Sequence, residues 1–444
     1  MTINSITIGR RVVIPFRKAI GKSSSGAIVL LIATIAALLM ANSHWADSYH
    51  KLWQINMGFS LGDFHVYKPF ILWINDGLMS IFFFVVGLEL KREIVSGELS
   101  NPKNAVIPFI AGIGGMVMPA VIYLAINAGT DGEALNGWGI PMATDIAFAL
   151  GILYLLGNRV PLSLKVFLTA LAIIDDLGAV SVIAFFYTSD ISIGNLGIGA
   201  AFLASMLAAN LMGVRNPLFY GALGIGGLWL AFLLSGVHAT IAAVLAAFTI
   251  PARYDITKYK YLRKADLILN KFCRVPVNDD KLLDEQQYNL LQSLKKNTDK
   301  AIPPLQMLEH KLHGFVSFVV LPIFAFSNAG ISFTGGFIEN INDTISLGII
   351  LGLLLGKVTG IVGFLYLSEK LKLIQLPRNI SYKLLFGVSC LAAVGFTMSL
   401  FITSLAFENP QYDYQARIGI LFASLLAGLI GYLILYRFLP KEKK

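Results

Sequence analysis

Charged residues are scarce in this chain. Lys, Arg, Asp and Glu make up 14% of its 444 residues, whereas soluble domains carry about 25%. Hydrophobic residues reach 56%, and the mean hydropathy is +0.70. So little charge excludes an ordinary soluble protein and predicts an all-α polytopic membrane protein.

Cysteine is also rare, and the common motifs of metal and nucleotide chemistry are missing. Cys273 and Cys390 are the two cysteines. One falls in an expected cytoplasmic loop and the other inside a span, which excludes a disulfide framework. The sequence contains no HExxH motif, P-loop or dinucleotide fingerprint, so we predict no cofactor. The net charge of +9 is explained by basic residues on one side of a membrane, without a nucleic-acid partner.

Long apolar runs, in contrast, are abundant. A helix needs about 20 apolar residues to cross a bilayer. On this measure the chain holds about twelve transmembrane helices in one domain over residues 27–438. The predicted spans are 27–45, 70–90, 105–127, 138–157, 161–187, 193–213, 217–234, 236–250, 313–331, 345–368, 383–406 and 415–437.

The loops between these spans alternate between basic and acidic. Lys and Arg gather in every second loop, and the intervening loops hold mainly Asp and Glu. The positive-inside rule then puts both termini, 1–26 and 439–444, in the cytoplasm together with the long loop 251–312. The first outer loop, 46–69, can form a short hairpin. The long inner loop can form amphipathic surface helices around Tyr259–Phe272 and Leu282–Leu294, or it is a solvated linker.

Two adjacent carboxylates lie inside an apolar span. Asp175 is roughly 20 Å along a helix from Pro161, deep in the hydrocarbon layer. A charged carboxylate there costs roughly 2.5–3.5 kcal/mol on insertion scales. Asp175 and Asp176 must therefore face a water-filled cavity, a cation or protons. The alternative is that one is protonated and the other salt-bridged, and that together they only lock helices.

Two spans carry breaks at corresponding places. Pro141 interrupts the fourth span just before Asp145, and Gly395 interrupts the eleventh. Spans 3–5 and 10–12 are thus triplets of opposite orientation with interrupted middle helices, crossing near the membrane middle. Such a pair points to inverted repeats and a midplane ion site. The hydroxyls of Thr397 and Ser399 need no chemistry, since hydroxyls in such helices commonly bond backbone groups.

The interruptions would leave four half-helix ends near the membrane centre. Asp145 can neutralise the positive N-termini and Lys357 the negative C-termini. Lys357 lies too deep in the tenth span to reach the interface easily, so it needs a partner. That partner is Asp175 or Asp176, unless the lysine only balances the helix dipoles; both roles are compatible.

Several motifs resemble those of the NhaA family of bacterial sodium/proton antiporters. They are Ala143–Phe148, Leu171–Gly178, Val86–Glu93, Leu308–His310 and Leu321–Gly330. The resemblance covers nearly the whole chain from residue 27 to 438. It departs at Val358, where the familiar pattern has proline after the lysine. It departs again at about 279–302, which looks like an insertion.

The resemblance implies a transporter of the bacterial inner membrane, in contact with lipid and assembled as a homodimer. It implies electrogenic export of sodium or lithium in exchange for protons, with activation at alkaline pH. Asp175 and Asp176 would form the sodium site, Asp145 and Thr144 would assist at the interrupted helix, and Lys357 would pair with Asp175 when sodium is absent. The residues that match positions of pH activation at the cytoplasmic funnel are Glu89, Arg92, Glu93, Glu309 and His238.

From the residues alone, the mechanism we expect is competition. Asp175 and Asp176 should titrate as a coupled pair, and their oxygens suit either a hard cation or protons. If two protons replace one sodium ion, each cycle moves one net charge. Acid would protonate the site and block sodium, so exchange should rise with cytoplasmic pH.

Three other functions remain open from the residues. A cation channel would line a pore with rings of charge or carbonyls, whereas here one dyad faces one lysine. A proton-coupled carrier of organic solutes would need a larger polar pocket. An intramembrane aspartyl protease would need facing aspartates, and adjacent residues point about 100° apart on one helix; Asp145 with Asp175 would fit better.

Overall fold

The structure is a computed structural model that describes residues 25–61, 64–130, 132–188, 191–275, 282–333, 337–377 and 380–440. Most of these residues are helical, as the all-α prediction requires. The predicted cytoplasmic ends lie mainly outside the described residues: helix α2 already begins at Ser25, and the description stops at residue 440.

Every predicted span coincides with helix in the structure. Eight helical stretches among the described residues are long and apolar enough to cross a membrane. They are α4–η1–α5 (Phe70–Trp73, Ile74–Leu78, Met79–Ser96), α6 (Pro102–Asn127), α7–η3–α8 (Gly132–Leu135, Asn136–Met142, Ile146–Leu155), α9 (Leu162–Phe186), α10 (Ile193–Leu211), α16–η6–α17 (Pro304–Phe315, Val316–Val320, Leu321–Asn328), α19–η7–α20 (Thr344–Leu351, Gly352–Lys357, Val358–Lys370) and α23 (Pro410–Phe438).

The remaining predicted spans are bent or short. Two bent pairs pass the same test together: α2 (Ser25–Ala41) with α3 (Ala46–Gln54), and α21 (Tyr382–Ala392) with α22 (Phe396–Ala406). Two helices are shorter: α11–η5–α12 (Pro217–Leu223, Gly224–Trp229, Leu230–Leu233) and α13 (Ala239–Thr249). In the described part of the chain the test thus supports eight to ten spans, and the count of twelve stays a prediction.

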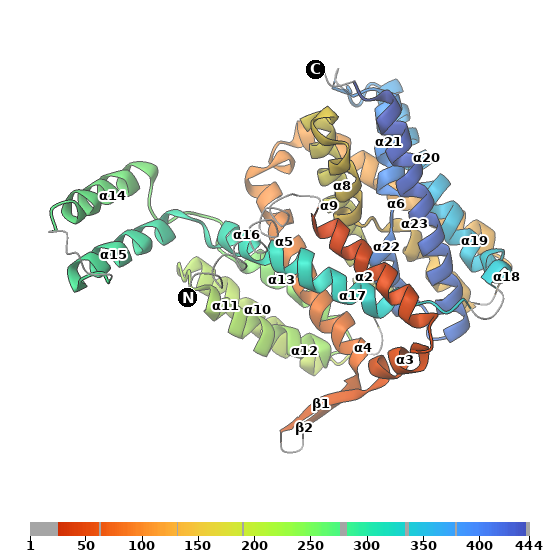
Figure 1. Ribbon diagram of the computed structural model, residues 1–444, viewed down its shortest axis with the longest axis horizontal. Coiled ribbons are helices and arrows are strands. Elements are labelled where there is room, and N and C mark those ends of the chain that lie inside the picture. Colours follow the sequence, from red (N-terminus) through yellow and green to blue (C-terminus); the bar gives the residue numbers. More distant parts are fainter. Residues whose placement is uncertain are drawn as a thin grey trace, which may run out of the picture.

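Two hairpins project from the bundle (Figure 1). The antiparallel strands β1 (Asn56–Leu61) and β2 (Phe64–Pro69) pair with Met57 opposite Lys68. The helices α14 (Lys258–Phe272) and α15 (Glu285–Ala301) stand to one side of the bundle. In the chain they follow α13 and precede α16. Short elements complete the description: η2 (Glu98–Ser100), η4 (Gly157–Arg159) and α18 (Phe337–Ile341).

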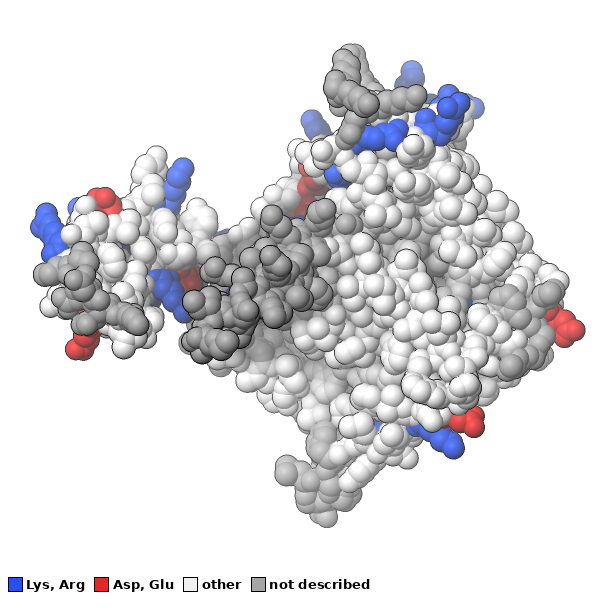
Figure 2. All heavy atoms as spheres, viewed as in Figure 1, with Lys and Arg blue, Asp and Glu red and all other residues white. Residues whose placement is uncertain are grey.

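The surface agrees with a membrane-spanning bundle. On the face seen in Figure 2, a broad band over the bundle is almost free of Lys, Arg, Asp and Glu. Charged side chains gather at the two ends of this band and on the α14–α15 hairpin. The apolar band is the surface that lipid would cover.

One predicted boundary is wrong. The long inner loop was expected to continue to residue 312, but α16 begins at Pro304 and runs without a break into η6 and α17. Proline at the first helical turn is favoured because its missing N–H would have no partner there. Glu309 therefore lies on a long helix rather than in a loop.

The two expected triplets are α6, η3/α8, α9 and α19–η7–α20, α21/α22, α23. Their first helices, α6 and α19–η7–α20, pack directly against each other. Glycine makes this close approach possible: a Cβ at Gly360 would lie 2.0 Å from the carbonyl oxygen of Gly114. This packing fixes the height of η7 and so of Lys357, which ends it.

We expect Gly360→Ala to destabilise the protein, because the new methyl group would push two helix backbones apart. Overpacking of this kind typically costs about 1–3 kcal/mol. Thermal unfolding in detergent checks the effect. Gly363→Ala on the same helix is the matched control, since nothing lies within 4 Å of its added Cβ; it should be neutral or slightly stabilising. Equal losses in the two variants would contradict the packing explanation.

Candidate functional site

The two interrupted helices cross at the centre of the bundle. Between η3 and α8 the chain is extended at Ala143 and Asp145, and between α21 and α22 it turns at Ala393–Gly395. The backbone N–H of Asp145 donates to the carbonyl oxygen of Val394 at 2.7 Å. The predicted interruptions are thus confirmed, and they contact each other directly.

Asp145 caps two helices at once. Its Oδ1 accepts from the N–H of Phe148 at 2.9 Å, in the first turn of α8. Its Oδ2 accepts from the N–H and the hydroxyl of Thr397, at 3.1 and 2.5 Å, in the first turn of α22. A carboxylate is stabilised at a helix N-terminus by the unpaired N–H groups and the helix dipole. Asp145 therefore lies where the positive helix ends meet, as expected.

The hydroxyl of Thr397 does not follow the common pattern of bonding backbone. Its partner is the side chain of Asp145, from another helix. The signal was its position two residues after the break at Gly395, at the start of a helix. Ser399 follows the expected behaviour and donates to the carbonyl oxygen of Ile140 at 2.8 Å.

Lys357 is fully buried and bridges the two halves. Its Nζ lies 2.8 Å from Oδ2 of Asp175, and both side chains are 0% exposed. The same Nζ donates to the carbonyl oxygen of Met142, at the C-terminal end of η3. Of the two candidate partners, the structure pairs Lys357 with Asp175. The lysine also serves a negative helix end, so the two proposed roles coexist. Val358 continues the helix directly from Lys357.

Thr144 completes this arrangement. Its hydroxyl lies 2.8 Å from Oδ2 of Asp175 and 2.7 Å from the carbonyl oxygen of Ala392, at the end of α21. One hydroxyl proton can serve only one of these acceptors at a time. Asp175 is therefore held by the ammonium group of Lys357 and the hydroxyl of Thr144. Each of these donors has a second acceptor, the carbonyl oxygen of Met142 for the lysine and that of Ala392 for the threonine.

Asp176 differs sharply from its neighbour. It is fully buried, and neither of its carboxylate oxygens has a hydrogen-bond partner among the described residues; Oδ1 of Asp175 also lacks one there. Gly112 of α6 allows the close approach of α9 at this point, because a Cβ there would lie 2.6 Å from Cγ2 of Ile174, next to Asp175. A buried, unpaired carboxylate is costly, so these three oxygens are suited to a proton or a cation.

A resident metal centre is not evident in the part of the chain that the structure describes. No group of three or more His, Cys, Asp or Glu side chains is placed there to hold a metal ion. A transported ion at Asp175 and Asp176 would therefore use the two carboxylates together with neutral oxygens.

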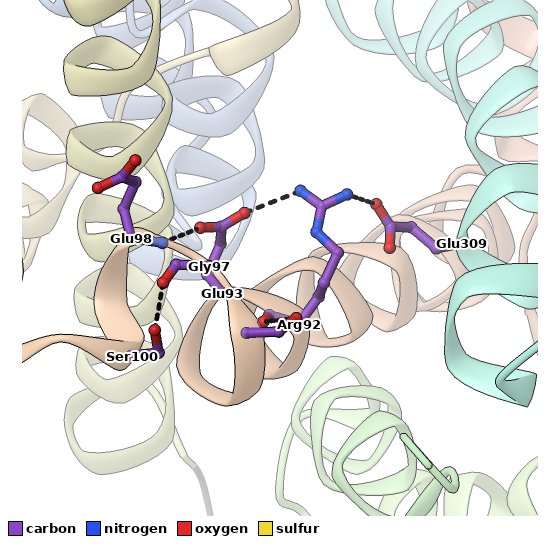
Figure 3. A network of polar contacts seen from close by, with 7 residues as sticks. Arg92, Glu93, Gly97, Glu98, Ser100 and Glu309 are labelled. Atoms are coloured by element: carbon purple, nitrogen blue, oxygen red, sulfur yellow. Dashed lines mark hydrogen bonds and ion pairs between the residues drawn. The ribbon is translucent and has the colours of Figure 1, made fainter. Parts of the chain in front are cut away.

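A second charged cluster joins α5 to α16 (Figure 3). Arg92 donates to Oε1 of Glu93 at 2.9 Å and forms an ion pair with Glu309. The other carboxylate oxygen of Glu93 accepts from the N–H of Glu98 at 3.0 Å, which ties in the turn after α5. Glu89 lies one turn earlier and interacts electrostatically with Glu309, Arg92 and Glu93.

Lys91, a residue not singled out from the sequence, donates to the carbonyl oxygens of Phe248 and Ile250 at 2.6 and 2.5 Å. It thereby caps the C-terminus of α13, a role that a single lysine near a span end does not reveal in the sequence.

His238 does not join this cluster, contrary to its expected place at the same funnel. It begins α13, whereas Lys91 contacts the other end of that helix, about 16 Å away at 1.5 Å per residue. The Nε2 atom of His238 lies 2.6 Å from the carbonyl oxygen of Tyr187, just after α9 ends. The structure thus separates His238 from Glu89, Arg92, Glu93 and Glu309.

The geometry does not favour a pair of catalytic aspartates. Both oxygens of Asp145 are engaged at helix N-termini, and Asp175 is paired with Lys357. Two aspartates of a protease would instead share a proton across a water molecule. The remaining arrangement, with unpaired acidic oxygens beside an ion pair at crossed half-helices, is typical of a transporter.

Comparison with known proteins gives the same result. A family model described as Na+/H+ antiporter 1 matches residues 17–435. Named Na(+)/H(+) antiporter NhaA, a protein of Oleidesulfovibrio alaskensis is 48% identical over 95% of this chain and 93% of its own length. A protein of the same name from Sulfurimonas denitrificans is 45% identical over 97% of both chains. A third, Na(+)/H(+) antiporter NhaA 1 of Saccharophagus degradans, is 44% identical over 96% of this chain.

These matches cover both interrupted helices and both charged clusters. They agree with a multi-pass membrane protein that exchanges sodium for protons and is a transporter rather than an enzyme. The chain therefore belongs to the Na+/H+ antiporter 1 family, that of the NhaA antiporters.

Proposed function

We propose that Asp175 and Asp176 bind either one sodium ion or two protons, and that this competition drives electrogenic export of sodium or lithium. The observation that carries the proposal is the contrast between the two side chains. Asp176 has two buried oxygens without a partner, while Asp175 is held by Lys357 and Thr144. The unpaired oxygens of Asp176 can bind sodium or a proton, and Lys357 can be displaced from Asp175.

In this mechanism sodium arrives at a site whose carboxylates are ionised. The cation binds Asp176 and Asp175 and competes with Lys357 for the second carboxylate. The freed ammonium group retains the carbonyl oxygen of Met142 as an acceptor. When protons return, they neutralise both aspartates and sodium leaves. The ion pair between Asp175 and Lys357 reforms when these protons are released on the other side of the membrane. Only the chain's own carboxylates and amine are needed to couple the two flows.

Exchange of two protons for one sodium ion moves one net charge in each cycle. A membrane potential then contributes roughly 2.3 kcal/mol per 100 mV. Sodium can therefore be expelled without a large pH gradient. The crossing of the half-helices suits movement of one triplet relative to the rest of the bundle, which would expose the site to each side in turn.

The remaining parts of the proposal concern the membrane, the orientation of the chain, its assembly and its activation by pH. We place the protein in the bacterial inner membrane, with both termini in the cytoplasm, because the basic loops favour that side. We retain a lipid-embedded homodimer as the assembly. Protonation of the site at low pH would block sodium, so exchange should be activated at alkaline pH.

The test is proton flux from reconstituted vesicles after a sodium pulse, with and without an imposed potential. An electrogenic exchanger should run faster when the potential pulls the net charge in the direction of transport, and proton flux should cease without sodium or lithium. Sodium flux that continues without proton counterflow would indicate a channel. Exchange that is indifferent to the potential would refute the two-for-one stoichiometry.

We expect Glu309→Gln to shift the activation profile to more alkaline pH while leaving the maximal rate in place. A neutral amide mimics protonated Glu309 and removes the partner of Arg92 across α5 and α16. A partly exposed ion pair contributes up to about 1 kcal/mol, equivalent to a shift of up to about one pH unit. Exchange rates measured against pH give the result. Glu339→Gln, on an exposed helix, is the control, and a profile unchanged in both variants would argue against the cluster's role.

A further inference from the structure

The α14–α15 hairpin is attached to the bundle by a structured neck. The N–H of Asp255 donates to the carbonyl oxygen of Lys300 at 3.0 Å, and that of Leu305 to Pro251 at 3.2 Å. Arg215, between α10 and α11, donates to the carbonyl oxygens of Arg253 and Ile302 at 2.9 and 3.3 Å. The neck therefore lies at the level where membrane helices end. In Figure 1 the hairpin stands apart from the bundle, beyond the end at which α16 begins.

The two helices of the hairpin pair through one face each. Ala265 of α14 is buried, and Tyr261 accepts through its backbone carbonyl from Asn297 of α15 at 3.3 Å. On α15 the matching face holds Leu290 and Leu294, which are partly buried. This pairing leaves side chains on the flanks of both helices exposed.

One open flank of the hairpin is apolar. Leu262 and Leu269 of α14 are about half exposed, and so is Tyr288 of α15, with Leu291 39% exposed. The spacing puts the two leucines on one stripe of α14, and Tyr288 and Leu291 on one stripe of α15, each about a quarter-turn from the paired face. Because the helices are antiparallel, both stripes open on the same side of the hairpin.

Charged residues of both signs border this apolar side. By the same helical spacing, Lys258 continues the stripe of α14, whereas the stripe of α15 continues with Lys295, Asp284 and Asp299. Over its whole length α14 carries five basic residues and one acidic residue. An amphipathic helix with leucine and aromatic side chains on one flank and an excess of lysine and arginine lies in the interface of an anionic membrane.

We propose that the α14–α15 hairpin docks its apolar flank, Leu262, Leu269, Tyr288 and Leu291, on the anionic phospholipid surface beside the bundle. The excess of basic residues on α14, five against one acidic, selects this occupant, since anionic headgroups attract lysine and arginine. The neck holds the hairpin next to the surface, so docking needs no long-range search. The hairpin is then a membrane contact of the antiporter outside its spans.

The test uses the full chain in a Cys273→Ser background with an environment-sensitive fluorophore. The dye is attached at Leu269→Cys on the apolar flank or at Lys300→Cys on the opposite flank. Vesicles are made of phosphatidylcholine, with or without phosphatidylglycerol, and contain nitroxide-labelled lipid as a quencher. Both leaflets have the same composition, so the result does not depend on insertion direction or on exchange activity.

We expect a blue shift and quenching at position 269 in the anionic vesicles, with neither at position 300. High salt should reverse the signal because it screens exposed charges. Reversal of Lys258 and Lys295 to Glu should lower the ratio of docked to undocked hairpin roughly 25-fold, from about fivefold per basic residue lost. Reversal of Lys296 and Lys300 makes the same change in net charge on the opposite side and should have a much smaller effect.

Several results would overturn the proposal. Equal signals at positions 269 and 300, or equal signals with and without phosphatidylglycerol, would show that the flank does not meet anionic lipid. A signal that grows with protein density and ignores lipid charge would mean that a second copy covers the flank. If a charge-reversed protein fails to fold, the comparison of lipids and the salt reversal with Lys258 and Lys295 intact still decide the question.

Discussion

Asp176→Asn is expected to reduce sodium-dependent proton flux by at least roughly 10²-fold. Asparagine keeps the shape of the side chain but removes its negative charge and its ability to release a proton at this site. Loss of one partner from a buried charge interaction typically costs 3–5 kcal/mol, which corresponds to that factor or more. Because both oxygens of Asp176 lack a protein partner, the change breaks no hydrogen bond of the folded protein. Transport should therefore fail while stability is kept.

The matched control for this variant is Asp413→Asn. Asp413 lies on α23 and forms an ion pair with Arg417 at 2.7 Å, four residues further along the same helix. Such pairs contribute about 0.2–0.5 kcal/mol, so exchange should continue almost unchanged. Flux assays in vesicles, with thermal unfolding measured on the same samples, separate transport from folding. Normal exchange by Asp176→Asn would be incompatible with the proposed mechanism.

Lys357→Met is expected to destabilise the protein by about 3–5 kcal/mol, because it leaves Asp175 as a buried carboxylate without its cation. Methionine fills a similar volume, so the loss reflects charge rather than a cavity. Thermal unfolding in detergent, at a fixed scan rate, gives the measurement. The loss should shrink as the pH falls, since a protonated and uncharged Asp175 costs less to bury.

A double variant tests the cause. Adding Asp175→Asn to Lys357→Met removes both charges, and replacing a buried ion pair by neutral groups is often close to neutral for stability. We therefore expect the double variant to be markedly more stable than Lys357→Met alone, although it should not transport. If both proteins were equally unstable, the ion pair would not be the reason for the loss.

Most of the helix architecture around this site could be predicted from the sequence. The depth of Asp175 and Asp176 in an apolar run, and the breaks at Pro141 and Gly395, follow from rules that depend on local composition. Opposite orientation of the two interrupted helices follows from the alternation of loop charge. These features need no knowledge of which side chains meet.

Contacts between segments far apart in the sequence were harder to predict. The choice of Asp175 over Asp176 as the partner of Lys357 depends on how α6 and η7 pack, which glycines such as Gly360 control. Thr397 reaches Asp145 only because the two breaks lie against each other. The start of α16 at Pro304 was missed because a polar, amphipathic helix resembles a loop in a hydropathy count. His238 was grouped by resemblance alone, and its helix carries it to the far end of α13.

Asp175 and Asp176 are proposed to bind sodium and protons in turn. The most direct test is calorimetric titration of sodium into the purified protein, in buffers of different ionisation enthalpy. The dependence of the heat on the buffer gives the number of protons released for each sodium ion bound. We expect proton release at a pH where the aspartates hold protons, and no sodium binding or release in Asp176→Asn. Sodium binding without proton release at any pH, or release unchanged in Asp176→Asn, would contradict competition at Asp175 and Asp176.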